Sequence, residues 1–413
     1  MPISRYGISG HPQLTNQAWE IGHHRLPADS VHFRILNKPN DYVDMKRFAM
    51  VAGARPNFMK IAPILRELDA ASDTRTTLIH TGQHYDRNLS DVFFEELGIR
   101  KPDLSLGVGS GSHAQQTADV MIAIEKVLLE ARSSGEPIDR LIVVGDVNST
   151  MAAAIAASKL HVPVAHVEAG LRSFDRLMPE EINRIVTDAI SDLLLCSEPA
   201  GVENLVREGH DRSSVHLVGN VMIDTLLTQV DRARERDILD RLELTAGEYG
   251  VVTLHRPSNV DDREPLASLL EVLAEISERL PLVFPVHPRT RSRLDEFELR
   301  AVLDRAPRLM ALDPQGYLDF LCLTSQAKVI VTDSGGLQEE STALDVPCLT
   351  MRSTTERPIT CSSGSGTLIG NSAGLLREEL ESVLSGDYKT GCCPELWDGN
   401  AAKRIVEVLL QAK

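Results

Sequence analysis

The feature of this sequence that most restricts its fold is a series of short, mostly apolar segments, each followed by a polar loop and an amphipathic stretch. Strands buried on both faces have this continuous apolar character, and they occur in parallel sheets covered by helices. Strands are expected at residues 47–52, 76–80, 141–144, 162–167 and 193–196, and again at 250–255, 281–287, 328–332 and 347–351. The alternation predicts an α/β protein with two Rossmann-like parallel-sheet domains.

The domain organisation follows from length and from a break in the alternation. The chain has 413 residues, more than the ~250–300 at which a single core usually stops growing. Residues 1–44 are polar and lack helical or strand periodicity, so we expect a poorly ordered tail and a fold beginning at Met45. A long charged segment after residue 220 separates the two sets of strands. We therefore expect an N-terminal domain over residues 45–220 and a C-terminal domain over residues 221–390.

Charge and composition restrict the partners. The formal net charge of −16 repels nucleic acid at long range, although a local group of arginines can still bind a small anion. The six cysteines form no C-x-x-C pair, as is typical where thiols stay reduced. The N-terminus has no apolar signal segment, and no run of ~18 apolar residues could span a bilayer. We expect a cytoplasmic protein without nucleic-acid or membrane partners.

Candidate acid–base residues follow the predicted strands. Because the carboxyl ends of parallel strands lie at one edge of a sheet, side chains there are expected to line one crevice. Carboxylates that meet in a partly dry crevice raise one another's pKa, which suits general acid–base catalysis, and the candidates are Asp146, Glu168, Glu180 and Glu181. Each also has a simpler interpretation. Asp146 would cap a helix, and the two glutamates would favour the first helical turn after Pro179.

The segment T-D-S-G-G-L-Q-E-E predicts an anion site. Ser334 and the two glycines that follow it would open a helix whose free N–H groups face an anion, with room for a phosphate to approach the backbone. The simpler interpretation is a strand-to-helix turn capped by the serine. Arg352 and Arg357, shortly downstream, supply guanidinium groups suited to phosphate and favour the anion interpretation.

Other familiar motifs are missing or out of context. His80 and His84 are four residues apart, but the T-G-Q between predicts a loop rather than a helical metal pair. G-V-G-S-G-S lacks the last glycine of the dinucleotide fingerprint, and no P-loop or G-x-S-x-G motif occurs. The sequence therefore gives no support for zinc, nicotinamide, P-loop or hydrolase-elbow chemistry.

Nine motifs occur in a fixed order: G-A-R-P-N-F-M-K-I-A-P, T-G-Q-H, G-D-V-N-S-T, H-V-E-A-G-L-R with P-E-E-I-N-R, G-N-V-M-I-D, L-H-R, P-V-H, T-D-S-G-G-L-Q-E-E and M-R-S-T-T-E-R-P. In this order they resemble the non-hydrolysing UDP-N-acetylglucosamine 2-epimerases. The likeness extends from about Met45 to about Gly370. One such motif is weak, whereas the ordered set is highly specific.

The resemblance implies a glycosyltransferase B fold with its active site in the interdomain cleft and a C-terminal helix, within residues 391–413, packing back on the N-terminal domain. It also implies a homodimer and no metal or redox cofactor. The implied activity is reversible conversion of UDP-N-acetylglucosamine (UDP-GlcNAc) into UDP-N-acetylmannosamine (UDP-ManNAc), by elimination of UDP to 2-acetamidoglucal and re-addition. Two alternatives stay open: a hydrolysing 2-epimerase that releases ManNAc and UDP, and a UDP-sugar sensor without turnover.

The resemblance also assigns residues by motif. Asp146, Glu168 and Glu180 match the catalytic carboxylates, without individual acid or base roles, and His255 would stabilise leaving UDP with Arg55 and Arg357. Arg172 and Arg184 would either steady the carboxylates or contact phosphate. The full set of substrate-binding candidates is Arg55, Lys60, Arg172, Arg184, Gln315, Phe320, Ser334, Gly335, Gly336, Glu340 and Arg357, of which Gln315 and Phe320 would flank uracil.

Three stretches depart from the typical family pattern. Residues 83–87 read Q-H-Y-D-R instead of Q-H-R-x-M, in the region that builds the allosteric UDP-GlcNAc site of well-studied bacterial members. The loop R-S-F-D-R-L-M-P is shorter than its counterpart, and L-H-R-P-S-N replaces G-H-R-R-E. These departures leave open allosteric activation and the preferred N-acyl or C3 substituent of the sugar.

Overall fold

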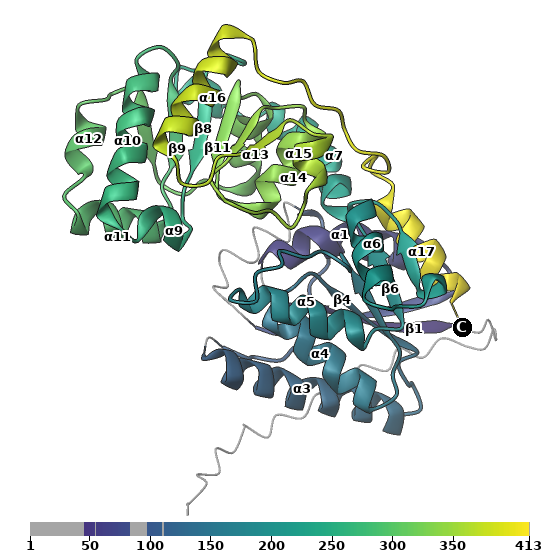
Figure 1. Ribbon diagram of the computed structural model, residues 1–413. Helices are drawn as coiled ribbons and strands as arrows, with labels where there is room; N and C mark the ends of the chain where they lie inside the picture. Colours follow the sequence, from purple (N-terminus) through teal and green to yellow (C-terminus); the bar gives the residue numbers. More distant parts are fainter. Residues whose placement is uncertain (1–44, 54, 83–96, 110, 413) are drawn as a thin grey trace, which may run out of the picture. The chain divides into compact units, whose positions relative to one another are not determined.

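A computed structural model describes residues 45–53, 55–82, 97–109 and 111–412, with only the backbone described at Arg55 and Pro56 (Figure 1). The predicted tail, residues 1–44, and the Q-H-Y-D-R segment lie outside the described residues.

The first part of the chain forms a seven-stranded sheet in the order β3-β2-β1-β4-β5-β6-β7, and every neighbouring pair is parallel. Its strands are β1 (Lys46–Ala52), β2 (Thr74–His80), β3 (Leu104–Ser105), β4 (Arg140–Val144), β5 (Val164–Val167), β6 (Leu193–Cys196) and β7 (Val215–Leu217). The strand order reverses between β1 and β4, so their carboxyl ends flank a topological switch point, where α/β sheets bind ligands.

Helices cover both faces of this sheet because successive strand residues point to opposite sides. Phe48, Met50 and Ala52 of β1 pack in the core cluster that contains α1 (Arg55–Ala70), whereas Ala49 and Val51 pack in the cluster that contains α3 (His113–Ser133) and α4 (Asn148–Lys159). Figure 1 shows α3, α4 and α5 side by side. The remaining helical segments here are α5 (Pro179–Ala189), α6 (Pro199–Arg207) and the 3-10 turn η1 (Arg212–Ser214).

The second sheet has six parallel strands in the order β10-β9-β8-β11-β12-β13, with its switch point between β8 and β11. The strands are β8 (Gly250–Thr253), β9 (Leu282–Pro285), β10 (Leu309–Leu312), β11 (Val329–Thr332), β12 (Cys348–Thr350) and β13 (Gly366–Leu368). The helices are α7 (Val221–Arg234), α8 (Ile238–Arg241), α9 (Pro257–Val260), α10 (Arg263–Ser277), α11 (Pro288–Glu296), α12 (Arg300–Asp304), α13 (Tyr317–Ser325), α14 (Gly335–Ala343), α15 (Ile359–Ser362) and α16 (Ala373–Ser385). The predicted pair of parallel α/β sheets is confirmed, and the exact domain boundaries stay a prediction.

The last helix, α17 (Ala401–Gln411), belongs to the core of the first sheet. Its buried residues Ile405 and Leu409 share a cluster with α1 and β1. The Asp224 carboxylate of α7 accepts hydrogen bonds from the backbone amides of Ala401 and Ala402, at 3.1 and 2.7 Å, and so satisfies free N–H groups at the start of α17. The chain therefore returns to its first sheet after completing the second.

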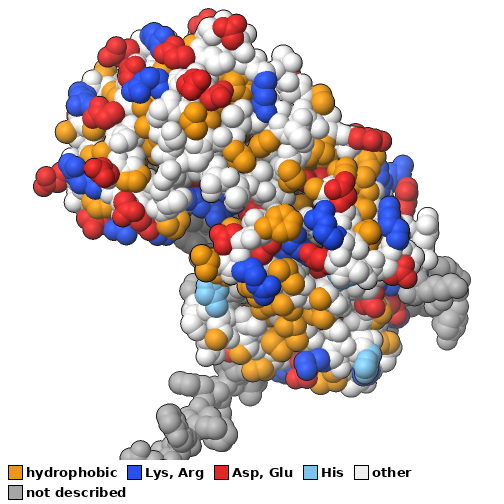
Figure 2. Space-filling view, in the orientation of Figure 1, with side chains coloured by type: hydrophobic (Ala, Val, Ile, Leu, Met, Phe, Trp, Pro, Cys, Tyr) orange, Lys and Arg blue, Asp and Glu red, His pale blue; other side chains and the backbone are white. Residues whose placement is uncertain are grey.

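The surface over α10, α12 and α16 carries both charge signs, and Figure 2 shows blue and red side chains intermixed there. Arg305 pairs with Glu271, and Arg377 with Glu275 at 2.9 Å. Exposed pairs of this kind contribute little stability. These arginines pair at the exposed surface, whereas those at the strand ends described below pair in buried surroundings. No helix in the described part of the chain is both long and apolar enough to cross a bilayer.

Candidate active site

Asp146 and Glu168 follow the carboxyl ends of the adjacent strands β4 and β5. Glu168 has a φ of 69°, a left-handed conformation that non-glycine residues rarely adopt and that is often found at functional sites. Gly145, with φ of 72°, lies next to the Glu168 side chain. A Cβ at Gly145 would come within 3.4 Å of both Glu168 Oε2 and Lys60 Nζ, so glycine leaves room for these two groups to meet.

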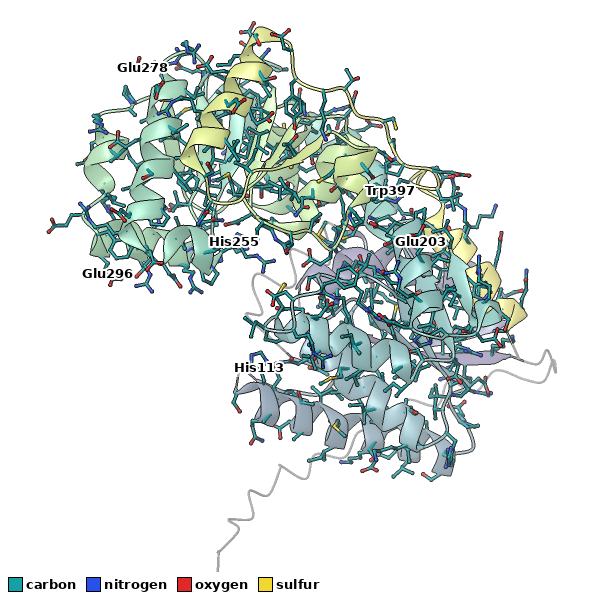
Figure 3. All side chains as sticks on the ribbon, in the orientation of Figure 1. His113, Glu203, His255, Glu278, Glu296 and Trp397 are labelled. Atoms are coloured by element: carbon teal, nitrogen blue, oxygen red, sulfur yellow. The ribbon has the colours of Figure 1, made fainter. Side chains whose placement is uncertain are left out.

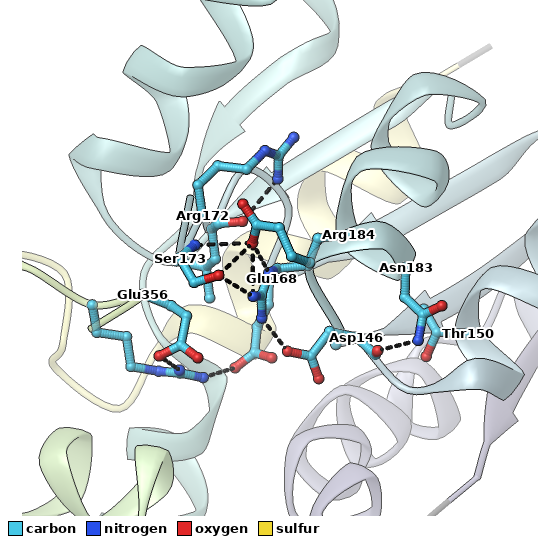
Figure 4. A network of polar contacts seen from close by, with 12 residues as sticks. Asp146, Thr150, Glu168, Arg172, Ser173, Asn183, Arg184 and Glu356 are labelled. Carbon is cyan, nitrogen blue, oxygen red and sulfur yellow. Dashed lines mark hydrogen bonds and ion pairs between the residues drawn. The ribbon is translucent and has the colours of Figure 1, made fainter. Parts of the chain in front are cut away.

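A buried arginine holds Asp146 in place (Figure 4). Arg184 of α5 donates from Nη1 to Asp146 at 2.5 Å and from Nε and Nη2 to Glu181 at 3.0 and 2.8 Å. Glu181 also accepts from the amides of Ser173 and Phe174, each at 2.9 Å. Burial opposes its ionisation, but the Ser173 amide and Arg184 hold the pKa of Glu181 below its ordinary value. Glu181 and Arg184 of α5 thus fix both the 172–178 loop and Asp146.

Glu168 lies between two cations. Lys60 of α1 forms a buried ion pair with its Oε2, and Arg357 Nη2 lies 4.0 Å from its Oε1. Only 4% of Glu168 is exposed. Each of its two carboxylate oxygens thus faces a cation, at the end of β5.

Arg357 follows β12 and is itself surrounded by carboxylates. Its Nε lies 2.6 Å from Glu339, and its Nη1 lies 3.9 Å from Glu356. Burial opposes the charge, but Glu339 and Glu168 hold the pKa of Arg357 above its ordinary value. Arg352 Nη1 pairs with Glu356 at 2.9 Å; against the effect of burial, this contact lowers the pKa of Glu356 to about 2.

The N-terminus of α14 faces these arginines. A Cβ at Gly335 would lie 3.4 Å from Arg357 Nη1 and 4.0 Å from Arg352 Nη1. Ser334 is the N-cap residue, but its side chain makes no capping hydrogen bond. The simple capped-turn interpretation therefore does not account for the serine. Free helical N–H groups beside two guanidinium groups form a site suited to a diphosphate.

A histidine pair follows β8 and β9. His255, labelled in Figure 3, places Nδ1 2.7 Å from the buried carboxylate of Asp333. Asp333 also accepts from the amides of His255 and Arg256, at 2.9 and 2.8 Å. Against burial, the contact with His255 holds the pKa of Asp333 below its usual range. The His287 ring centroid lies 5.3 Å from that of His255; burial, followed by the His255 charge, lowers the pKa of His287.

Known proteins with similar sequences and structures place this chain in a family. The family model described as UDP-N-acetylglucosamine 2-epimerase matches residues 66–410. The UDP-N-acetylglucosamine 2-epimerase of Methanococcus maripaludis is 40% identical over 374 residues, covering 89% of this chain and 100% of that protein. The chain belongs to the UDP-N-acetylglucosamine 2-epimerase family.

Two further relatives show the range of this family. The crystal structure of the Methanocaldococcus jannaschii UDP-GlcNAc 2-epimerase, in complex with UDP-GlcNAc and UDP, is 40% identical and matches with a TM-score of 0.79, over 89% of this chain and 100% of that one. The UDP-2,3-diacetamido-2,3-dideoxy-D-glucuronate 2-epimerase of Pseudomonas aeruginosa is 39% identical over 365 residues, covering 87% of this chain and 98% of that protein. The structural match confirms the predicted glycosyltransferase B fold of the family.

Several residues predicted from the family motifs come together. Lys60 and Glu168 are paired, Arg184 holds Asp146, and Arg357 contacts the side of Gly335. Asp146 does not cap α4, because the N-cap residue is Val147. The simpler interpretation of Asp146 therefore fails, and its catalytic role stays a prediction.

Other predicted residues have different surroundings. Arg172 is buried and pairs with Asp188 at 2.7 Å and Glu208 at 2.6 Å, so its guanidinium already has two acidic partners. Glu180 is half-buried in the first turn of α5 and makes no hydrogen bond or ion pair with other described residues. Gln315 donates to the Asp313 carbonyl at 2.6 Å. Phe320 of α13 packs partly buried in the core, Gly336 is the second residue of α14, and the Arg55 side chain lies outside the described part. Their predicted contacts with substrate stay predictions.

Sequence reasoning missed residues that act through others. Asp333 was part of a quoted motif, but only the structure shows that it orients His255. Glu339 was treated as part of a helix, although it is the strongest partner of Arg357 and accepts from Asn220 Nδ2 at 2.8 Å. The consecutive glutamates of Q-E-E gave no signal for this pairing, since both are buried and only Glu339 meets a cation among the described residues.

Glu198 and Glu340 are buried carboxylates without a cation at hydrogen-bond distance. Neither oxygen of Glu198, which follows β6 and is 1% exposed, has a hydrogen-bond partner of good geometry among the described residues. Burial raises the pKa of Glu198 to about 8, despite the attraction of Arg357. Burial and the neighbouring Glu339 raise the pKa of Glu340 to about 8. Both groups are therefore neutral near pH 7 in the folded protein.

The Glu198→Gln variant is expected to gain stability relative to the wild type as the pH rises. The folded-state pKa of Glu198, about 8, lies above the ordinary value of 4.5, so its contribution to stability is present below pH 4.5 and is lost as the pH rises toward 8. Glutamine has no such loss. In melting curves, the stability of the variant relative to wild type should be higher at pH 8 than at pH 5 by at least about 1 kcal/mol, or roughly 2–4 °C in Tm. The exposed Glu203→Gln serves as control; equal changes at both pH values would contradict the raised pKa.

Proposed function

We propose that this protein reversibly interconverts UDP-GlcNAc and UDP-ManNAc without net hydrolysis, through 2-acetamidoglucal. The observation that carries the proposal is the position of Glu168, which lies beside Lys60 and 4.0 Å from Arg357, the arginine that faces the N-terminus of α14. A base that follows a strand of the first sheet thus lies beside a diphosphate site that follows strands of the second. The family and the UDP complex of the Methanocaldococcus jannaschii relative support the same assignment.

The first step is an elimination. The C2 proton of the sugar is not acidic, since no carbonyl is adjacent to its carbon. Breaking the C1–O bond, with its electron pair leaving on the UDP oxygen, gives C1 oxocarbenium character and acidifies C2–H. A carboxylate then takes the proton, and the C1=C2 double bond of 2-acetamidoglucal forms. Cations at the helix N-terminus stabilise the charge that develops on UDP.

The second step is re-addition. A protonated group gives a proton to the opposite face of C2, and the UDP oxygen forms a new bond to C1. Two acid–base groups on different sides of the sugar are required, and Asp146 and Glu168 come from separate loops. Because Asp146 is held by Arg184 and Glu168 by Lys60, each carboxylate keeps its place through the reaction.

Solvent deuterium gives the direct test of the proposed reaction. Incubation of the protein with UDP-GlcNAc in D2O is expected to yield UDP-ManNAc, with one deuteron at C2 of both sugars at equilibrium, as followed by NMR. Free ManNAc with UDP and no UDP-ManNAc would favour a hydrolysing 2-epimerase instead. Binding of UDP-GlcNAc without deuterium incorporation would mean that the protein is a sensor.

A second candidate substrate is a UDP-2,3-diacetamido-2,3-dideoxyuronic acid. The relative named for that activity is 39% identical to this chain, against 40% for the relative named for UDP-GlcNAc, so overall similarity does not separate the two sugars. The reaction and the acid–base groups would be unchanged. The ratio of kcat/KM for the two substrates, measured in the same D2O assay, decides between them. Light scattering on the purified protein tests the predicted homodimer.

A further inference from the structure

His166 of β5 is fully buried, and both of its ring nitrogens meet oxygen atoms. Nδ1 lies 2.6 Å from Asp188 Oδ1 of α5, and Nε2 lies 2.9 Å from the carbonyl oxygen of Gly145. A carbonyl oxygen only accepts hydrogen bonds, so Nε2 must carry a proton. The charge of the ring is therefore decided at Nδ1, by the state of Asp188.

Asp188 is placed to be an anion. Its Oδ2 accepts from the Gly170 amide at 3.1 Å and lies 2.7 Å from Arg172 Nη2. Burial opposes its ionisation, but His166 and then Arg172 hold the pKa of Asp188 below its ordinary value. An ionised Asp188 accepts from Nδ1, which then also carries a proton.

The ring connects two parts of the candidate active site. Gly145, whose carbonyl it binds, immediately precedes Asp146, and Glu168 follows His166 by two residues on the same strand end. The Cα side of Gly145 lies against Glu168 Oε2 and Lys60 Nζ. The orientation of one peptide group thus sets the position of Asp146 and the space in which the Lys60–Glu168 pair forms.

We propose that His166 is a positioning residue protonated on both ring nitrogens, which with Asp188 locks the Gly145 peptide and thereby holds Asp146 and Glu168 in register for catalysis. Its catalytic consequence rests on the proposed function, whereas its charge state does not. Because the ring is fully buried and its nitrogens meet Asp188 and Gly145, it would act on catalysis through Gly145.

The charged and titratable groups around His166 come from each neighbouring element. They are Asp188 on α5, Arg172 on the loop between β5 and α5, Glu208 at the end of α6 through Arg172, Cys196 on β6 close to Asp188, and Glu168 with Asp146 at the strand ends. Burial, followed by the charge of Asp188, raises the pKa of the Cys196 thiol well above its usual range, so that group stays neutral. Asp188 is the anion in direct contact with the ring.

Nitrogen-15 NMR of ring-labelled histidines in the intact, ligand-free protein tests the charge state. At pH 8 the His166 ring is expected to show protons on both nitrogens, with assignment from the spectrum of His166→Gln. His80 is a matched internal control, because it is also buried, and burial lowers its pKa, so its ring should be neutral in the same spectrum. An unprotonated His166 Nδ1 at pH 8 would place the proton on Asp188 and overturn the proposal.

Kinetics of Asp188→Asn test the positioning role. Asparagine keeps the shape but removes the anion, so the variant ring is expected to become neutral as the pH rises, and its charge-assisted contact with residue 188 is replaced by a weaker, neutral hydrogen bond. The kcat of the variant relative to wild type should fall by about 100-fold between pH 6 and pH 8.5, as for a misplacement of about 1 Å, while UDP affinity stays within about tenfold. A kcat ratio independent of pH would overturn the positioning role. If the variant does not fold, the NMR result on the wild type decides, and it is independent of epimerase activity.

Discussion

Glu168→Gln is expected to lose turnover while still binding UDP. Glutamine keeps the size of the side chain, but it cannot take the C2 proton, and general acid–base groups typically contribute about 10²–10⁴-fold to rate. Because the proposed diphosphate contacts lie on Arg357 and the start of α14, UDP affinity should stay within about tenfold, or roughly 1.4 kcal/mol. Isothermal titration with UDP and deuterium incorporation at C2 measure the two effects separately.

A parallel variant and a control variant accompany this measurement. Asp146→Asn should behave in the same way, since its carboxylate is the second one held at the strand ends. Glu203→Gln, on the exposed side of α6, should leave both measurements unchanged. Equal loss of UDP binding and turnover in Glu168→Gln would mean that Glu168 is a structural partner of Lys60 and Arg357 instead of a base.

Arg357→Met is expected to have two large effects, on stability and on UDP binding. The substitution leaves Glu339 buried without its cation, and an uncompensated buried charge of this kind costs about 3–5 kcal/mol. It also removes a guanidinium from the N-terminus of α14, so UDP affinity should fall by about 100-fold, or roughly 2.7 kcal/mol. Urea denaturation and titration with UDP measure the two losses.

A double variant separates these effects. Adding Glu339→Gln to Arg357→Met removes the unpaired carboxylate, so most of the stability should return while UDP binding stays weak. Arg305→Met breaks only the exposed pair with Glu271 and should change stability by less than about 1 kcal/mol. Recovery of UDP affinity in the double variant would show that Arg357 supports the fold without contacting the diphosphate.

The fold was largely predictable because strands buried on both faces are continuous apolar runs in the sequence. The runs at 141–144 and 193–196 correspond to β4 and β6, which have no exposed residue. Strands without such a continuous apolar run were missed. β3 has two residues and lies at a sheet edge, and β10, at the corresponding edge of the second sheet, has only one fully buried residue. Edge strands meet water on one side, so their composition resembles that of loops.

The candidate site was predictable only at the level of residue types at strand ends. Motif order pointed to Asp146, Glu168 and Arg357, and the parallel sheets explain why they lie at strand ends. The sequence did not indicate the ion-pair partner of each residue, which is Arg184 for Asp146, Lys60 for Glu168, and Glu339 for Arg357. These partners are between 18 and 108 positions apart, and side-chain direction at such separations depends on packing.

The sequence by itself determined which segments are buried strands, that they form two parallel sheets, and which acids, histidines and arginines follow them. Tertiary structure alone decided which of these groups are charged and which are held in place. Whether Glu198 is neutral, Glu181 ionised or His166 bound on both sides depends on burial and on the nearest partner. The free energy of a buried charge is set by groups within a few ångströms in space, and chain order does not specify those distances.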